Sequence, residues 1–131
     1  MKFTSAKYEA AENILHLWFP QRVMLTDAAT VEEFFREVTH DWIDRCPKPP
    51  FLLVNYKNLH ISPAATQHYA ANIAAFQSKI IATFRYAVSA DLTGVAVSMG
   101  NLMLSRPANV FSDEAEARAA IAAFRQSQPP A

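Results

Sequence analysis

The sequence predicts an α/β fold: a single open mixed β-sheet of about five strands with about four helices, in the order β-β-α-β-α-β-α-β-α. Three neighbouring segments support this prediction. The apolar run at 51–54 is typical of a buried strand, the polar segment at 55–61 of a loop, and the spaced apolar residues at 62–80 of an amphipathic helix. Open α/β sheets bind ligands where a strand leads into a helix, so we expect the functional region here.

Two strands, at 2–9 and 13–19, are expected before the first helix, joined by a tight turn. Thr30 and Glu33 have the spacing of a capping box, which predicts a helix from Thr30 to about Arg45. Its predicted apolar stripe consists of Val31, Phe34, Phe35, Val38 and Trp42. One face of this helix should therefore be buried against the sheet.

The second helix is expected to begin with Ser62 as its N-cap and Pro63 at the first helical position. Its predicted buried face consists of Ala65, Tyr69, Ile73, Phe76 and Ile80. A strand at 81–88 should follow, and Asp91 would then cap a third helix at 92–104.

The C-terminal part is expected to hold a short strand at 109–111 and a final helix at 113–124, capped by Ser112. Residues 126–131 should form a frayed tail. Neither a linker nor an internal repeat interrupts the pattern, so residues 1–131 are expected to form a single domain.

Composition limits the class of protein. The chain has 131 residues, 51% of them hydrophobic, with 2 Gly and a formal net charge of +0. A neutral charge argues against nonspecific binding to nucleic acid or to an anionic membrane. The single Cys46, the lack of an apolar signal peptide and the lack of a run of about 18 apolar residues predict a bacterial cytoplasmic protein without a membrane span.

Candidate binding residues gather at the predicted strand-to-helix junction: Asn55, Lys57, His60, Ser62 and His68. Lys57 and His60 would hold an anion beside the helix N–H groups that follow Ser62. The spacing of His60 and His68 matches no zinc motif, and no Gly-rich phosphate loop is present, so we expect neither a metal nor a cofactor. The loop has no Asp or Glu that could act as a general acid or base, so we do not expect this protein to be an enzyme. His16, inside a strand, should be structural.

Two segments carry a resemblance to a known family. The segment 55–59, Asn-Tyr-Lys-Asn-Leu, follows an apolar strand and leads to a capped helix, and the segment 110–117, Val-Phe-Ser-Asp-Glu-Ala-Glu-Ala, leads into the last helix. Together with the element order, these resemble the SpoIIAA-like, or STAS-like, domains. The resemblance implies a regulatory domain that docks a protein partner through the loop and helix after the third strand. It also implies phosphorylation of a serine at the helix start, although 61–65 reads Ile-Ser-Pro-Ala-Ala instead of Asp-Ser-Ser. Ser62 therefore either replaces that serine or precedes it.

The alternative function is the binding or sensing of a small apolar, lipid-like or anionic ligand. The aromatic residues that would line its cavity are Trp18, Phe34, Phe35, Trp42, Phe76 and Phe84. Their spacing is equally typical of a packed core. Lys57 or His60 would then hold the polar head of the ligand. For the interaction domain, the partner is another protein or a second copy in a homodimer, with the Met-containing helix 92–104 as an additional contact surface.

Overall fold

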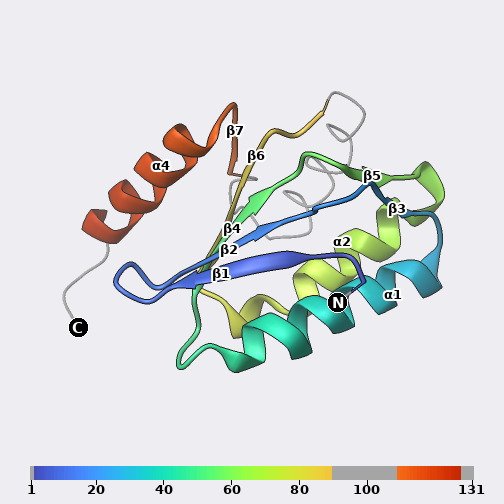
Figure 1. Ribbon diagram of the computed structural model, residues 1–131, viewed down its shortest axis with the longest axis horizontal. Helices are drawn as coiled ribbons and strands as arrows, with labels where there is room; N and C mark the ends of the chain where they lie inside the picture. The colour runs from blue at the N-terminus through green and yellow to red at the C-terminus, as the bar shows by residue number, and fades with distance from the viewer. Residues whose placement is uncertain (1, 90–108, 128–131) are drawn as a thin grey trace.

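The computed structural model describes residues 2–89 and 109–127, and its central element is a five-stranded mixed sheet in the order β1-β2-β4-β6-β7 (Figure 1). The strands are β1 Ser5–Glu9, β2 Ile14–Trp18, β4 Phe51–Asn55, β6 Ala82–Tyr86 and β7 Val110–Phe111. β1 is antiparallel to β2, and every other pairing in this sheet is parallel. The predicted mixed α/β sheet of five strands is therefore confirmed.

A second, two-stranded parallel sheet is formed by β3 (Val23–Leu25) and β5 (Leu59–Ile61). The prediction that 55–61 is entirely loop is wrong for its last three residues. Leu59 and Ile61 are buried while His60 between them is half-buried, and this alternation is too short to identify a strand from sequence.

The first helix, α1 (Ala28–Glu37), begins two residues before Thr30, the predicted start. Asp27 is its N-cap, with the carboxylate accepting a 2.9 Å hydrogen bond from the Thr30 N–H, and the Thr30 hydroxyl accepts from the Asp27 N–H at 3.1 Å. The predicted capping box of Thr30 and Glu33 is therefore wrong: the box joins Asp27 and Thr30, and Thr30 occupies the third helical position instead of the N-cap. The chain continues as a π-helical turn at Val38–Trp42 and a 3-10 turn at Ile43–Arg45.

The second helix, α2 (Thr66–Ala75), follows a 3-10 turn at Pro63–Ala65. Pro63 does occupy the first helical position, but the predicted capping by the Ser62 side chain is wrong. The Ser62 hydroxyl donates to the Thr26 carbonyl at 3.1 Å instead, which ties the residue to the end of β3. The predicted buried face is confirmed for all of its members, Ala65, Tyr69, Ile73, Phe76 and Ile80.

The final helix, α4 (Glu114–Ser127), is capped by Asp113, whose carboxylate accepts from the Glu116 N–H at 2.9 Å. Ser112 was therefore the wrong cap, and its hydroxyl bonds to the Glu116 carboxylate. The helix also extends past 124 into the predicted frayed tail. The described residues contain three α-helices, and the predicted helix at 92–104 lies outside the described residues.

The helices lie on both faces of the main sheet, with α1 and α2 on one side and α4 on the other (Figure 1). Alternate residues of β2 and β4 therefore enter different cores. The larger core packs sheet residues such as Leu17 and Leu52 against Phe34 and Phe35 of α1. The smaller core consists of Ile14, Phe51, Leu53, Phe84, Tyr86, Ala117 and Ile121. Burying each large apolar side chain contributes about 1.5–3 kcal/mol.

Candidate functional site

A chain of polar contacts crosses the α4 face of the sheet and links β2, β6 and α4. His16 Nε2 lies 2.7 Å from the Tyr86 hydroxyl, and that hydroxyl donates to Glu114 Oε1 at 3.3 Å. Tyr86 is the last residue of β6 and Glu114 is the first of α4, so the contacts meet where parallel strands end and a helix begins. Ligand sites of α/β sheets occupy this kind of edge.

Arg118 completes this group and binds two carboxylates at once. Its Nη1 and Nη2 atoms donate to the two oxygens of Glu9 at 2.7 and 2.8 Å, and its Nε donates to Glu114 Oε2 at 2.8 Å. A guanidinium bound to a carboxylate at two points is held in a fixed plane. We call the group Glu9, His16, Tyr86, Glu114 and Arg118 the α4 polar network.

The surroundings of His16 determine which ring nitrogen carries the proton. Arg118 Nη2 lies 3.5 Å from His16 Nδ1, and a guanidinium can only donate, so Nδ1 is the unprotonated nitrogen. Nε2–H then donates to the Tyr86 oxygen, and the Tyr86 O–H donates to Glu114. In this arrangement every donor meets an acceptor, and His16 is neutral.

The electrostatics of the network follow from this geometry. Burial lowers the pKa of His16, since the neighbouring carboxylates only partly offset the loss of hydration. Burial and the nearby Glu114 charge raise the pKa of Tyr86 to about 12. The hydrogen bonds from Arg118 lower the pKa of both Glu9 and Glu114. The carboxylates and the guanidinium are therefore charged at neutral pH, while the imidazole and the phenol are not.

Backbone strain marks the same edge of the sheet. Ala87, the residue directly after Tyr86, has a φ of 59°, in the left-handed region that an alanine enters only at a cost. The Asn55 side chain, at the end of β4, also hydrogen-bonds Tyr86. Strained residues gather at functional sites when the surrounding structure holds them in place.

The five predicted site residues do not form one cluster. Asn55 lies beside Tyr86, and its side-chain oxygen accepts a hydrogen bond from the Lys57 backbone N–H at 2.9 Å. The Lys57 side chain is exposed. His60 lies on β5, Ser62 at its end, and His68 on α2. The structure thus divides the set among the end of β4, the small β3–β5 sheet and α2.

The outer side of the small sheet is an exposed surface with a defined shape. Met24 and His60 are register partners in the β3–β5 pair, and Met24 is 46% exposed. The flanking strand residues Val23, Leu25, Leu59 and Ile61 all face inward and are buried. Hydrogen bonds from Thr30 lower the pKa of the Asp27 carboxyl at the end of β3, and the nearby His68 side chain makes a small further contribution. We call Met24, His60, Ser62 and His68 the β3–β5 face.

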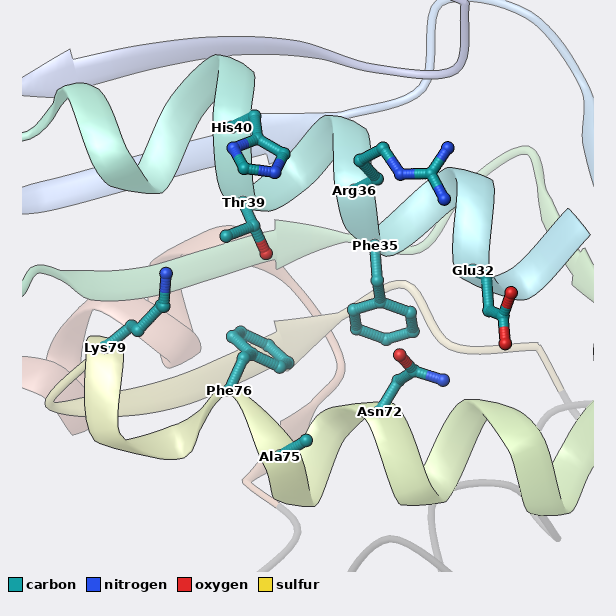
Figure 2. A pocket seen from close by; sticks show the side chains of 9 residues that line it. All are labelled: Glu32, Phe35, Arg36, Thr39, His40, Asn72, Ala75, Phe76 and Lys79. Atoms are coloured by element: carbon teal, nitrogen blue, oxygen red, sulfur yellow. The ribbon is translucent and has the colours of Figure 1, made fainter. Parts of the chain in front are cut away.

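A shallow groove of about 350 Å³ separates α1 from α2. Figure 2 shows Phe35 and Phe76 facing each other across it, with ring centroids 5.4 Å apart. Its lining residues are Glu32, Phe35, Arg36, Thr39, His40, Asn72, Ala75, Phe76 and Lys79. His40 and Lys79 both approach Asp44, at 3.5 and 3.1 Å. The His40 side chain is exposed.

The interior between the sheet and α1 and α2 is closely packed. The cavity there measures about 20 Å³, enough for roughly one water molecule. Phe34, Phe35 and Phe76, three of the predicted ligand-lining aromatics, are buried core residues that border it. A lipid-like ligand between sheet and helices would have to displace this core.

The network was missed in the sequence for a physical reason. Glu9 and Arg118 are 109 positions apart, and only the position of α4 against β1 brings them together. His16 was taken as structural because one polar residue in an apolar strand has no visible partner. The i,i+4 spacing of Glu114 and Arg118 was the available indication, and it is common on exposed helices.

Comparison with known proteins adds no assignment. Among the described residues, no helix is long and apolar enough to cross a membrane, and no group of three or more His, Cys, Asp or Glu side chains is arranged to hold a metal ion. No protein-family model matches the chain, and no curated protein matches it.

Proposed function

We propose that this chain is a non-catalytic interaction domain that docks a protein partner through the β3–β5 face. The observation that supports it is the register pairing of Met24 with His60, which sets a flexible apolar side chain beside an imidazole on the outer side of a small sheet. Methionine is enriched at interfaces because its thioether adapts to different surfaces.

Rigidity of this face favours binding. At the start of β5, Asn58 donates from Nδ2 to the Phe19 carbonyl at 2.9 Å, and its own φ of 73° is held in the left-handed region. At the end, the Ser62 N–H donates to the Leu25 carbonyl at 2.9 Å. A surface that is already ordered loses less conformational entropy when a partner binds.

Charge around the face indicates the chemistry of the partner. Arg22, Lys57 and His68 are exposed near the two strands, and Asp27 is the acidic neighbour at the end of β3. Complementarity then favours a partner that places carboxylates around an apolar group. A second copy of the chain is the other occupant that the experiment below would detect.

The resemblance to STAS-like domains adds a regulatory element to this proposal. A phosphate on Ser62 would break its hydrogen bond to the Thr26 carbonyl and add about two negative charges at the β3–β5 face. Docking of an acidic partner would then weaken. Intact-mass measurement of the chain from its native cells, with Ser62→Ala as the control, tests whether the residue is modified.

The docking proposal can be tested by comparing three immobilised proteins. Wild type, Met24→Asp and the control Ala122→Asp, on the exposed side of α4, are incubated with an extract of the native cells, and retained proteins are quantified by mass spectrometry. We expect a protein that wild type and the control retain and Met24→Asp loses. Equal retention by all three folded proteins would reject the β3–β5 face.

The groove between α1 and α2 favours a second candidate function, the binding of a small ligand. Its volume of about 350 Å³ falls within the range of small-molecule sites, and the cationic Arg36 and Lys79 line it together with the aromatic Phe35 and Phe76. An anionic ligand with an apolar part would suit it. Native mass spectrometry of gently purified protein, repeated after denaturation, should then show an extra mass that disappears with unfolding and is lost in Arg36→Gln.

A further inference from the structure

The carboxylate of Glu9 faces two groups that compete for it. It accepts both hydrogen bonds from Arg118, and its Oε2 also lies 3.9 Å from His16 Nδ1. At that distance the neutral imidazole makes no hydrogen bond to Glu9. Nδ1 instead faces Arg118 Nη2 at 3.5 Å as an acceptor.

Protonation of His16 changes this balance. A proton on Nδ1 turns the acceptor into a donor, so that two cationic donors face each other where a donor faced an acceptor. The nearest acceptor for the new N–H is Glu9 Oε2, which already accepts a hydrogen bond from Arg118 Nη2. The imidazolium and the guanidinium therefore cannot both keep their best contacts with Glu9.

We propose that the α4 polar network is a proton-operated latch, in which protonation of His16 displaces Arg118 from Glu9 and releases the first turns of α4 from the sheet. Glu9 belongs to β1 and Arg118 to α4, so their ion pair is a direct bond between the sheet and this helix. Weakening the pair frees the helix end that carries Glu114, and with it the contact to Tyr86.

The charges around His16 support this direction. On β1, Lys7 is its register partner and Glu9 is the nearby acid; on α4, Arg118 faces Nδ1 and Glu114 lies beyond Tyr86. The register neighbour on β4 is the uncharged Leu53. The acids and cations largely balance, so burial of the ring keeps His16 neutral until the solution becomes acidic.

The other half of α4 holds a separate attachment without a histidine. Ile121 is fully buried against the sheet, and the Phe124 ring packs edge-on against Phe51 at 5.6 Å. Arg125 Nη1 pairs with Glu12 at 2.5 Å. The latch should therefore open at the N-terminal turns of α4 while the C-terminal half stays docked.

Hydrogen exchange followed by NMR tests the latch. Amide protection factors, corrected for intrinsic exchange, are compared at pH 7.5 and pH 5.0 for residues 117–120 and 122–125. In wild type, protection at 117–120 should fall severalfold at pH 5.0, while protection at 122–125 stays unchanged. The Glu12→Gln control should show the same pH response at 117–120.

Two variants complete the test. In His16→Gln, whose side chain still donates to Tyr86 but cannot take a second proton, the pH response at 117–120 should disappear. In Glu9→Gln, protection there should already be low at pH 7.5 and independent of pH. A response retained in His16→Gln, or an equal loss along the whole helix in wild type, would overturn the latch.

Discussion

Arg118 and Glu9 form two parallel hydrogen bonds, of 2.7 and 2.8 Å, between the last helix and the first strand of the sheet. Both side chains are largely shielded from solvent, with 33% and 21% of their surface exposed. The pair therefore joins the ends of the chain through a contact that water screens only in part. α4 is held at this point by charge and by the buried Ala117, and further along by the apolar packing of Ile121 and Phe124.

The two-point geometry predicts that lysine cannot replace Arg118. Arg118→Lys keeps the charge but loses the second hydrogen bond to Glu9 and the one to Glu114, so the free energy of unfolding should fall by about 1–2 kcal/mol. Urea unfolding at pH 7.5 measures this. Lys7→Arg, an exchange of the same two residue types at an exposed strand position, should change stability little; an equal loss in both variants would contradict the interpretation.

Stability should depend on pH in two separate ranges. The folded-state pKa of His16 lies below its ordinary value of 6.5, so the unfolded chain binds more protons and stability falls as the pH drops from 6.5 toward the folded pKa. Glu9 and Glu114 also have lowered pKa values, so their contribution is present above pH 4.5 and is lost only below it. Urea midpoints measured from pH 8 to 4 should show the first decrease in wild type and not in His16→Gln. A flat curve between pH 6.5 and 5 would be evidence against a buried neutral His16.

Glu37 should contribute strongly to stability although it is an acid on a helix. The residue is 9% exposed, and its carboxylate accepts from the backbone N–H groups of Lys2, Phe3 and Thr4, at 2.6 to 3.1 Å, and also from the Thr4 hydroxyl. Glu37→Gln replaces one accepting oxygen by a donor and should cost about 1–3 kcal/mol. Exposed Glu32→Gln is the matched control, and similar thermal midpoints for the two variants would refute this role.

Relief of strain at Ala87 should stabilise the fold. Glycine adopts a φ of 59° without steric cost, so Ala87→Gly should gain roughly 0.5–1 kcal/mol after its own entropy cost. The same change at the exposed helix residue Ala71 should instead destabilise by about 1 kcal/mol. Chemical denaturation of both variants gives the comparison, and destabilisation in both would mean that Ala87 is unstrained.

The helices and main strands could be predicted because their patterns are local. The apolar run of β4 and the buried face from Ala65 to Ile80 depend only on residues close in sequence. Helix starts were less certain, since Asp27 and Thr30 both occur at capping spacing and either could be the N-cap. Ser62 has the residue type and the backbone conformation of an N-cap. Its hydroxyl, however, donates a hydrogen bond to the Thr26 carbonyl, and a sequence pattern does not reveal this.

The candidate site was predicted only in part because it depends on distant pairings. Lys57, His60 and His68 were proposed as binding residues because of their position after a strand, while Met24 became relevant only through its pairing with His60 in the small sheet. The α4 polar network required the docking of α4 on β1 and β2. Neither pairing leaves a periodic pattern in the sequence.

Site-specific photocrosslinking tests the proposed docking face most directly. A photoreactive residue is placed at Met24 in one protein and at the exposed Ala122 of α4 in another, and both are irradiated in the native cells. The proposal predicts one defined adduct, of a second protein or of the chain itself, from position 24 and none of that mass from position 122. Identical adduct patterns from both positions, with both proteins folded, would contradict a partner at the β3–β5 face.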